Sequence, residues 1–368
     1  MRQLPIGLDI GTTTVRMLQL GGSERDLRAV ATAKFVLPLE VKGDPKRRRE
    51  FIVEEVRRAM KEGRFRGREA VMVLPAGALA IRNIRVPKML NEELATAVNW
   101  EAQNKFPFDT ATAVIQYMRA GEIRQGDQLL DEIILFAVPR AEVDGQIEMA
   151  TEGGLDLVSL DARAAAVFRG FERYLCRRED EGVVNVYADI GAQTTVVISR
   201  GRDLVFVKTI PIGGTVFNRA VAECLELAPA EAEALRRRLG RRPAGEQAGA
   251  EDSARVTRAV ADAMRPHVED LADEIGLCLR YYGVTFRGPR LESLTFVGGE
   301  AHDPSVPAAL AQRLGMEARI GDPFRGVRVD HLGRSLDRRG IRAEWATAFG
   351  LCLKGFHVEA QFTAGYAA

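Results

Sequence analysis

The sequence contains two similar stretches, Leu8-Asp9-Ile10-Gly11-Thr12-Thr13-Thr14 and Ala188-Asp189-Ile190-Gly191-Ala192-Gln193-Thr194-Thr195. Each is an apolar run that ends in Asp-Ile-Gly and is followed by small polar residues and a second apolar run. This pattern predicts a strand, a tight turn and a second strand, with glycine letting the backbone approach a ligand. Hydroxyl groups and turn amides can donate hydrogen bonds to phosphate oxygens, and the aspartate can hold a hydrated divalent cation. Two such hairpins, each opening half of the chain, predict two related domains that grip one nucleotide from opposite sides.

Length and composition describe an ordinary globular protein. A chain of 368 residues predicts two or three domains, and 46% hydrophobic with 28% charged residues is typical of a packed core with a polar surface. The net charge of +1 gives no electrostatic reason to expect nucleic acid or an anionic membrane as a partner. The sequence shows neither a signal peptide nor an apolar run long enough to span a bilayer. We therefore expect a cytoplasmic protein, unless a partner brings it to a membrane.

Cysteines and histidines predict no metal site. The spacing between them resembles no known metal-binding motif, so the cysteines are interpreted as reduced core residues of a cytosolic protein. The residues concerned are Cys176, Cys224, Cys278, Cys352, His267, His302, His331 and His357.

Local signals predict several helix ends. Asn91 precedes a helical pattern and is a predicted N-cap, and Phe106-Pro107-Phe108 stops that helix. A long helix is predicted over residues 254–282, and Pro266 should bend it or split it in two. The Gly-, Ala- and polar-rich residues 241–253 predict a mobile loop.

The order of these elements resembles the PilM family of type IV pilus assembly proteins, which belongs to the actin-like ATPase superfamily and is related to the cell-division protein FtsA. The resemblance covers nearly the whole chain. Asp-Ile-Gly alone is shared by actins, sugar kinases and 70-kDa chaperones, whereas the Trp-Glu-Ala and Phe-Pro-Phe pair resembles the pilus family in particular. The segments that carry the resemblance are residues 7–14, 100–102 with 106–108, 188–191, 208–215 with 231–235, and 295–299 followed by 346–354.

The resemblance implies an α/β protein with the actin-like ATPase fold, that is, two duplicated ribonuclease H-like domains. A small α+β module is inserted in the first domain, and the last helix returns to that domain. The implied parts are residues 1–84 (first domain, first part), 85–155 (inserted module), 156–182 (first domain, interdomain helix), 183–343 (second domain, with a helical subdomain over 214–284) and 344–368 (C-terminal helix).

The resemblance also implies a site for ATP and Mg²⁺. Asp9 and Asp189 match the aspartates that hold magnesium through water in the superfamily. Glu300 departs from the family pattern, which has a small residue there; its carboxylate could hydrogen-bond the ribose or repel the phosphates. The phosphate turns match at Gly11, Thr12, Thr13, Gly191, Gln193 and Thr194, and the loops that line the ribose and base match at Gly213, Gly214, Gly298 and Gly299.

Two further features have two interpretations each. Asp161 either activates water at the hinge between the domains or is the N-cap of the helix that follows it. Trp100, Phe106 and Phe108 either form the rim of a partner groove or belong to the core of the small module.

The function implied by the resemblance is an ATP-binding cytoplasmic scaffold of a type IV pilus, or of a related secretion or competence machine. Its partner is the N-terminal cytoplasmic tail of the inner-membrane protein PilN, docked as an extended peptide between the first domain and the small module, which places the chain at the periphery of that membrane. ATP would close the two domains, with slow or no turnover because no committed general base is evident. Self-association stays open.

Two alternatives remain. An FtsA-like filament protein usually has a basic amphipathic helix at its C-terminus, but residues 355–368 contain no Lys or Arg. A small-molecule kinase of the same superfamily needs an aspartate base, for which Asp161 is the candidate.

Overall fold

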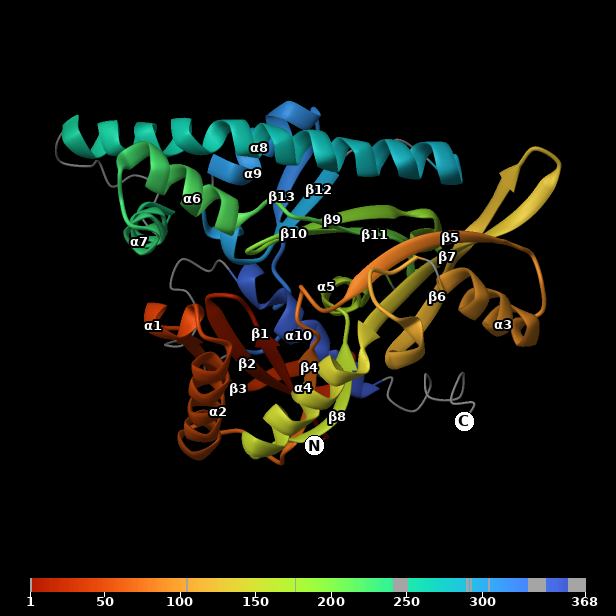
Figure 1. Cartoon of the computed structure of the whole chain (residues 1–368), viewed down its shortest axis with the longest axis horizontal. Helices are drawn as coiled ribbons and strands as arrows, with labels where there is room; N and C mark the ends of the chain where they lie inside the picture. The colour runs from red at the N-terminus through yellow and green to blue at the C-terminus, as the bar shows by residue number, and fades with distance from the viewer. Residues whose placement is uncertain are drawn as a thin grey trace.

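The computed structural model describes residues 2–103, 105–175, 177–240, 251–288, 291, 293–303, 305–329 and 342–356. Two five-stranded sheets with the same topology form its frame (Figure 1). The first has the order β3-β2-β1-β4-β8, and the second repeats it as β11-β10-β9-β12-β13. In each sheet the first three strands are antiparallel neighbours, and the last two are parallel to the first strand. The predicted α/β fold with two related halves is confirmed.

The strands have the following bounds. The first sheet contains β1 (Gln3–Ile10), β2 (Thr14–Ser23), β3 (Asp26–Val36), β4 (Glu69–Val73) and β8 (Asp156–Asp161). The second contains β9 (Val184–Ile190), β10 (Thr194–Arg200), β11 (Asp203–Ile210), β12 (Ser293–Val297) and β13 (Glu317–Ile320). A third, smaller sheet contains β5 (Ala80–Pro87), β6 (Ala113–Gln125) and β7 (Gln128–Pro139).

The helices connect and cover these sheets. The α-helices are α1 (Leu39–Lys42), α2 (Pro45–Glu62), α3 (Asn91–Ala102), α4 (Arg140–Glu152), α5 (Arg163–Glu172), α6 (Gly214–Leu225), α7 (Pro229–Gly240), α8 (Glu251–Phe286), α9 (Ser305–Leu314) and α10 (Ala346–Leu353). Short 3₁₀ helices are η1 (Thr110–Thr112), η2 (Arg178–Gly182), η3 (Gly299–His302), η4 (Ala343–Trp345) and η5 (Lys354–Phe356).

The central strands are apolar on both faces because helices cover both sides. In β2, Met17 faces one way and packs in a core with Ile52 of α2. The next residue, Leu18, faces the other way and packs with Phe349 of α10. Successive side chains of a strand point to opposite faces, so an unbroken apolar run is what a strand between two helical layers requires.

Helices α5 and α10 pack against each other in the centre of the molecule. α10 also packs on β1 and β2 of the first sheet, whereas α5 packs on β9, β10 and β11 of the second. Gly350 makes the close approach possible, because a Cβ built on it would lie 1.7 Å from the carbonyl oxygen of Ala166. The helix pair therefore joins the two halves.

The third sheet has the order β5-β7-β6 and lies beside the second half (Figure 1). α3 covers one face through Val98, whereas Ile134 on the other face joins the core of the second sheet. The Tyr281 hydroxyl of α8 donates to the Glu132 carboxylate of β7, which ties this sheet to the second half. Its β5 begins at Ala80, before the predicted module boundary at 85.

Two details of this region differ from the sequence analysis. The N-cap position of α3 is Leu90, and no side-chain cap hydrogen bond is formed, so the prediction of an Asn91 cap is wrong. Helix α4 lies within the range 85–155 that was assigned to the small module. Instead, Met149 and Ala150 place it in the core of the first sheet, where α4 contacts α2 and β8.

Helix α8 is continuous over 36 residues and lies along the second half (Figure 1). Pro266 is inside it, so of the two predicted outcomes, a bend or a split, the split is wrong. Buried residues on both sides of the proline, such as Met264 and Val268, hold the helix in one core, which compensates for the hydrogen bond that proline removes. Of the predicted loop 241–253, residues 241–250 lie outside the described residues and 251–253 belong to α8.

Within the described ranges, no helix is both long and apolar enough to cross a bilayer. Cys278 and Cys352 are buried as expected, but Cys224 is exposed, so its assignment to the core is wrong. Cys176 lies outside the described residues, as do His331 and His357.

The packing of α5 on α10 predicts opposite outcomes for two glycines. Gly350→Ala should lower the free energy of unfolding by about 1–3 kcal/mol, because the new methyl group meets the backbone of α5. Gly145→Ala in α4 is the control, since its Cβ would meet no atom within 4 Å and alanine favours a helix. Urea unfolding measures both. Equal stability of the two variants would contradict the close helix contact.

Candidate functional site

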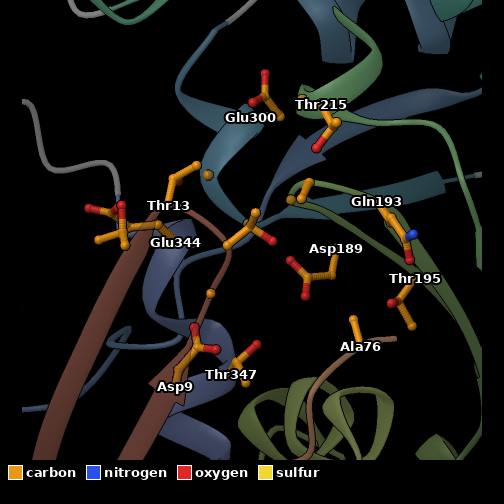
Figure 2. A pocket seen from close by; sticks show the side chains of 18 of the residues that line it. Asp9, Thr13, Ala76, Asp189, Gln193, Thr195, Thr215, Glu300, Glu344 and Thr347 are labelled. Atoms are coloured by element: carbon orange, nitrogen blue, oxygen red, sulfur yellow. The ribbon is translucent and has the colours of Figure 1, made fainter. Parts of the chain in front are cut away.

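A cavity of about 1020 Å³ lies between the two halves, at the upper end of the size range of small-molecule sites. Both Asp-Ile-Gly turns line it from opposite walls, together with the start of α6 and the β12–η3 loop (Figure 2). Most of the predicted site residues meet here. They are Asp9, Gly11, Thr12, Thr13, Asp189, Gly191, Gln193, Gly214, Gly298, Gly299 and Glu300.

The two turns are built alike. In the first, the Gly11 amide donates to the carbonyl of Thr14 at 3.0 Å; in the second, the Gly191 amide donates to the carbonyl of Gln193 at 3.0 Å. The first turn is also held from α2, since Arg48 donates to the Gly11 carbonyl at 3.0 Å. Each turn is therefore a closed loop at the end of the two strands that it joins.

Glycines hold the second turn in place. The Gly214 amide at the start of α6 donates to the Gly191 carbonyl at 2.8 Å. A Cβ on Gly213 would lie 2.7 Å from that same oxygen, so only glycine permits the contact. Gly298 has φ +91°, and a Cβ there would lie 2.4 Å from Asp189 Oδ1. The N-terminus of α6 thus adjoins the turn and the cavity.

Two of the predicted site residues, Thr194 and Gly213, do not line the cavity. Thr194 is fully buried at the start of β10, where its hydroxyl donates to the Ile212 carbonyl at 2.7 Å. The next side chain, Thr195, lines the cavity instead, because successive side chains alternate across a strand. Gly213 supports the turn without lining the cavity. The sequence analysis missed Thr195, which the period of a strand could have indicated.

Asp9 and Asp189 both bind one guanidinium. Arg163, the first residue of α5, donates to Asp9 Oδ1 at 2.7 Å and to Asp189 Oδ2 at 3.4 Å. It also donates to the Thr347 hydroxyl of α10 at 3.0 Å. Burial alone would lower the pKa of Arg163, but the two carboxylates outweigh it and raise the pKa above its ordinary value. The two halves are therefore joined by an ion triad at the floor of the cavity.

This arrangement does not fit a hydrated Mg²⁺ held between the two aspartates. A magnesium ion keeps several waters in a near-ideal octahedron and needs room around the carboxylates. Here one oxygen of each carboxylate accepts from the same Arg163 guanidinium, and the second oxygen of Asp9 lies 3.7 Å from Arg16 Nη1. Among the described residues, no group of three or more His, Cys, Asp or Glu side chains is arranged to hold a metal.

Asp161 lies outside this cavity, at the end of β8. Its carboxylate accepts from Arg169 at 2.7 Å and lies 3.3 Å from Lys354 Nζ. The N-cap position of α5 is Ala162, without a side-chain cap bond, so the prediction of an Asp161 cap is wrong. A carboxylate engaged by two cations away from the cavity is not positioned to activate water there.

A second buried cluster lies beside the first turn, and the sequence analysis missed it. Glu344 accepts from Arg16 at 2.6 Å and from Lys34 at 2.6 Å, and His302 Nε2 lies 3.5 Å away. Burial alone would raise the pKa of Glu344, but His302, Arg16 and Lys34 outweigh it and hold the pKa far below its ordinary value. Arg16 inside the apolar run of β2 was the available signal, because a charge there needs a partner.

Glu300 does not present an unpaired carboxylate to the cavity. It is ion-paired with Arg236 of α7, which also donates to Asn218 at 2.6 Å and lies over the ring of Phe217. The negative charge at this position, which the family pattern does not have, is therefore accompanied by a positive one.

Contacts between α7 and the first half cross the mouth of the cavity. Lys42 of α1 pairs with Glu233 at 2.9 Å, and Arg237 donates to the Thr13 hydroxyl of the first turn at 2.8 Å. Arg237 also pairs with Glu233 at 2.7 Å, so the three charges form one link between the halves.

The aromatic residues of the small module divide into two kinds. Trp100 in the last turns of α3 is 72% exposed, and Leu90, at the N-cap position before this helix, is 73% exposed. Phe106 and Phe108 are half-buried and stacked, with ring centroids 5.7 Å apart, and Phe106 packs against the core of the module. The exposed Trp100 is therefore not a core residue.

A family model described as type IV pilus assembly protein PilM matches residues 7–356. The chain belongs to the PilM family. A search of curated protein sequences finds no match. Among solved structures, a chain of a PilM–PilN type IV pilus biogenesis complex is 26% identical with a TM-score of 0.76, and the match covers 95% of this chain and 98% of that one.

More distant structures share the fold of this PilM-family chain. Ethanolamine utilization protein EutJ from Carboxydothermus hydrogenoformans is 15% identical with a TM-score of 0.56, covering 96% of this chain and 90% of that one. MreB5 of Spiroplasma citri, bound to ADP, is 12% identical with a TM-score of 0.50, covering 99% of both chains. The predicted actin-like ATPase fold is confirmed.

The Glu344 cluster predicts a pH-dependent contribution to stability. Because the folded-state pKa lies below the unfolded value of about 4.3, this contribution is present above that pH and is lost as the pH falls. Glu344→Gln should lower the free energy of unfolding by about 3 kcal/mol at pH 7, with a smaller difference from wild type at pH 3. Urea unfolding at both pH values measures this, with Glu54→Gln on the exposed side of α2 as a neutral control. A difference that does not shrink on acidification would contradict the assignment.

Proposed function

We propose that the cavity binds a nucleotide, with ATP as the expected ligand, and that the chain serves as a scaffold of the pilus machine. The observation that carries this proposal is the pair of closed turns, from two repeated sheets, facing each other across one cavity (Figure 2). The MreB5 structures with the same fold are bound to ADP and to AMPPNP, which supports a nucleotide here.

The phosphates would lie between the two turns. The N-terminus of α6 adjoins the second turn, and backbone amides with the helix dipole favour an anion there. Thr13 and Thr195 supply hydroxyl donors on the two walls. Gly298 and Gly299 line the cavity where the family pattern places the ribose and base, and a Cβ on Gly299 would meet no atom within 4 Å.

Turnover would be slow or absent. Asp161, the candidate base, is engaged by Arg169 and Lys354 outside the cavity. The physical role of the nucleotide is then to change how the halves meet. It would add contacts on both walls and shift the equilibrium toward the closed arrangement, which Lys42, Glu233 and Arg237 already link.

The partner would be the N-terminal tail of a PilN-like inner-membrane protein, which would place the chain at the periphery of that membrane. A PilM–PilN complex among the similar structures supports a partner of this class. We place the tail between the first half and the small module, with Trp100, Phe106 and Phe108 at the rim. The exposed Trp100 on α3 supports this placement, because aromatic residues are enriched where proteins bind.

The nucleotide site is tested by a substitution that displaces the second turn without adding an atom to the lining of the cavity. Gly213→Ala should weaken ATP binding at least about tenfold in calorimetric titration, because the methyl group would displace the Gly191 carbonyl. Gly77→Ala is the control, since it lines the same cavity and its Cβ would meet no atom within 4 Å. Wild-type protein that binds neither ATP nor ADP would refute the proposal. Equal binding by both variants would refute the placement of the phosphates.

The partner surface is tested with a labelled synthetic peptide of the partner's N-terminal tail. Trp100→Ala should weaken binding by about tenfold or more in fluorescence anisotropy, because a truncated aromatic anchor typically costs over 1 kcal/mol. Val284→Ala is the matched control, because that residue is 81% exposed and lies on α8 of the second half rather than on α3. Unchanged binding of the Trp100 variant would exclude α3 from the peptide site.

A further inference from the structure

Arg163 occupies a position between the two repeated halves that a mobile cation could also occupy. It is the first residue of α5, and its guanidinium contacts one carboxylate from each Asp-Ile-Gly turn. Both aspartates are nearly fully buried, Asp9 at 2% and Asp189 at 4% exposure. Two buried like charges facing one another need a positive charge between them. In this chain a side chain supplies it.

We propose that Arg163 is a built-in replacement for a divalent cation, so that the cavity binds nucleotide without requiring Mg²⁺. This inference rests on the proposed nucleotide site and concerns which cation that site uses. The Thr347 hydroxyl of α10, 3.0 Å from Arg163 Nη1, holds the guanidinium in its position. Residues of three elements, β1, β9 and α10, therefore hold Arg163 in place. Unlike an exchanging ion, it is also covalently part of the chain.

The chemistry of the group supports this role. A guanidinium stays charged at all physiological pH values, and both carboxylates raise the pKa of Arg163 further. It also presents several N–H donors in a fixed plane, which suits phosphate oxygens as well as carboxylates. Arg163 lines the cavity beside both turns, so an incoming nucleotide meets a guanidinium that is already fixed there by the two carboxylates.

The first experiment needs no nucleotide. Arg163→Gln leaves the two carboxylates facing each other without their cation. Addition of 10 mM MgCl₂ should then raise the melting temperature of this variant by about 3 °C or more, relative to NaCl of equal ionic strength. Wild-type protein should show no such rise. Arg169→Gln is the matched control. Arg169 is on the same helix, α5, and its buried ion pair with Asp161 lies outside the cavity.

The added variant Asp189→Asn tests where the ion binds. In the Arg163→Gln background it should abolish the magnesium-dependent rise, since one of the two carboxylates is then neutral. A rise of equal size in wild type and in Arg163→Gln would overturn the proposal, because the aspartates would then take the metal despite the arginine. An Arg163→Gln variant whose melting temperature does not rise with magnesium would overturn the proposal as well.

The second experiment measures ATP affinity by calorimetric titration in EDTA and in excess Mg²⁺. Wild type should bind with dissociation constants that agree within about threefold in the two conditions. Arg163→Gln should lose about tenfold or more in EDTA and regain it with Mg²⁺. Wild-type binding that strengthens tenfold or more with Mg²⁺ would overturn the proposal. If wild type binds no nucleotide in either condition, the proposed function fails, whereas the melting experiment still decides whether Arg163 takes the place of the ion.

Discussion

The repulsion between Asp9 and Asp189 is the constraint around which this structure is arranged. Duplication of one sheet places an aspartate at the same point of each half, and packing the halves together brings both carboxylates to one buried floor. Arg163 resolves that repulsion, and its position depends on α5. α5 is in turn fixed by α10, with Gly350 against its backbone. The position of Arg163 at the floor of the cavity therefore depends on the packing of α5 against α10 in the core.

The mouth of the cavity is built differently from its floor. Lys42, Glu233 and Arg237 link the halves through side chains that remain partly exposed, so salt screens these pairs more strongly than it screens the buried carboxylates of Asp9 and Asp189. The tight helix contact at the floor and the weak charged link at the mouth favour a hinge with a rigid base. A ligand bound between the turns could shift the mouth without disturbing the α5–α10 contact, which is how a nucleotide could alter a distant partner surface.

Sequence reasoning was most successful where chemistry lies within a few residues. The hairpins, the glycines around them and the duplicated architecture all follow from local pattern. It failed where long-range packing outweighs a local preference. Pro266 was expected to bend or split the long helix, but it lies inside one continuous helix that the second core holds together. Asp161 was expected either to activate water or to cap a helix, but the cations Arg169 and Lys354 bind its carboxylate.

The sequence by itself determined the two Asp-Ile-Gly turns, their strands and the family to which the chain belongs, because those properties reside in short runs of residues and their order. Only the tertiary structure decided what the aspartates bind. Arg163 is 154 residues from Asp9, and Glu344 is 328 residues from Arg16. No local pattern pairs such charges. The alternation of side chains across a strand and the packing of two halves bring them together, and burial then requires each charge to have a partner.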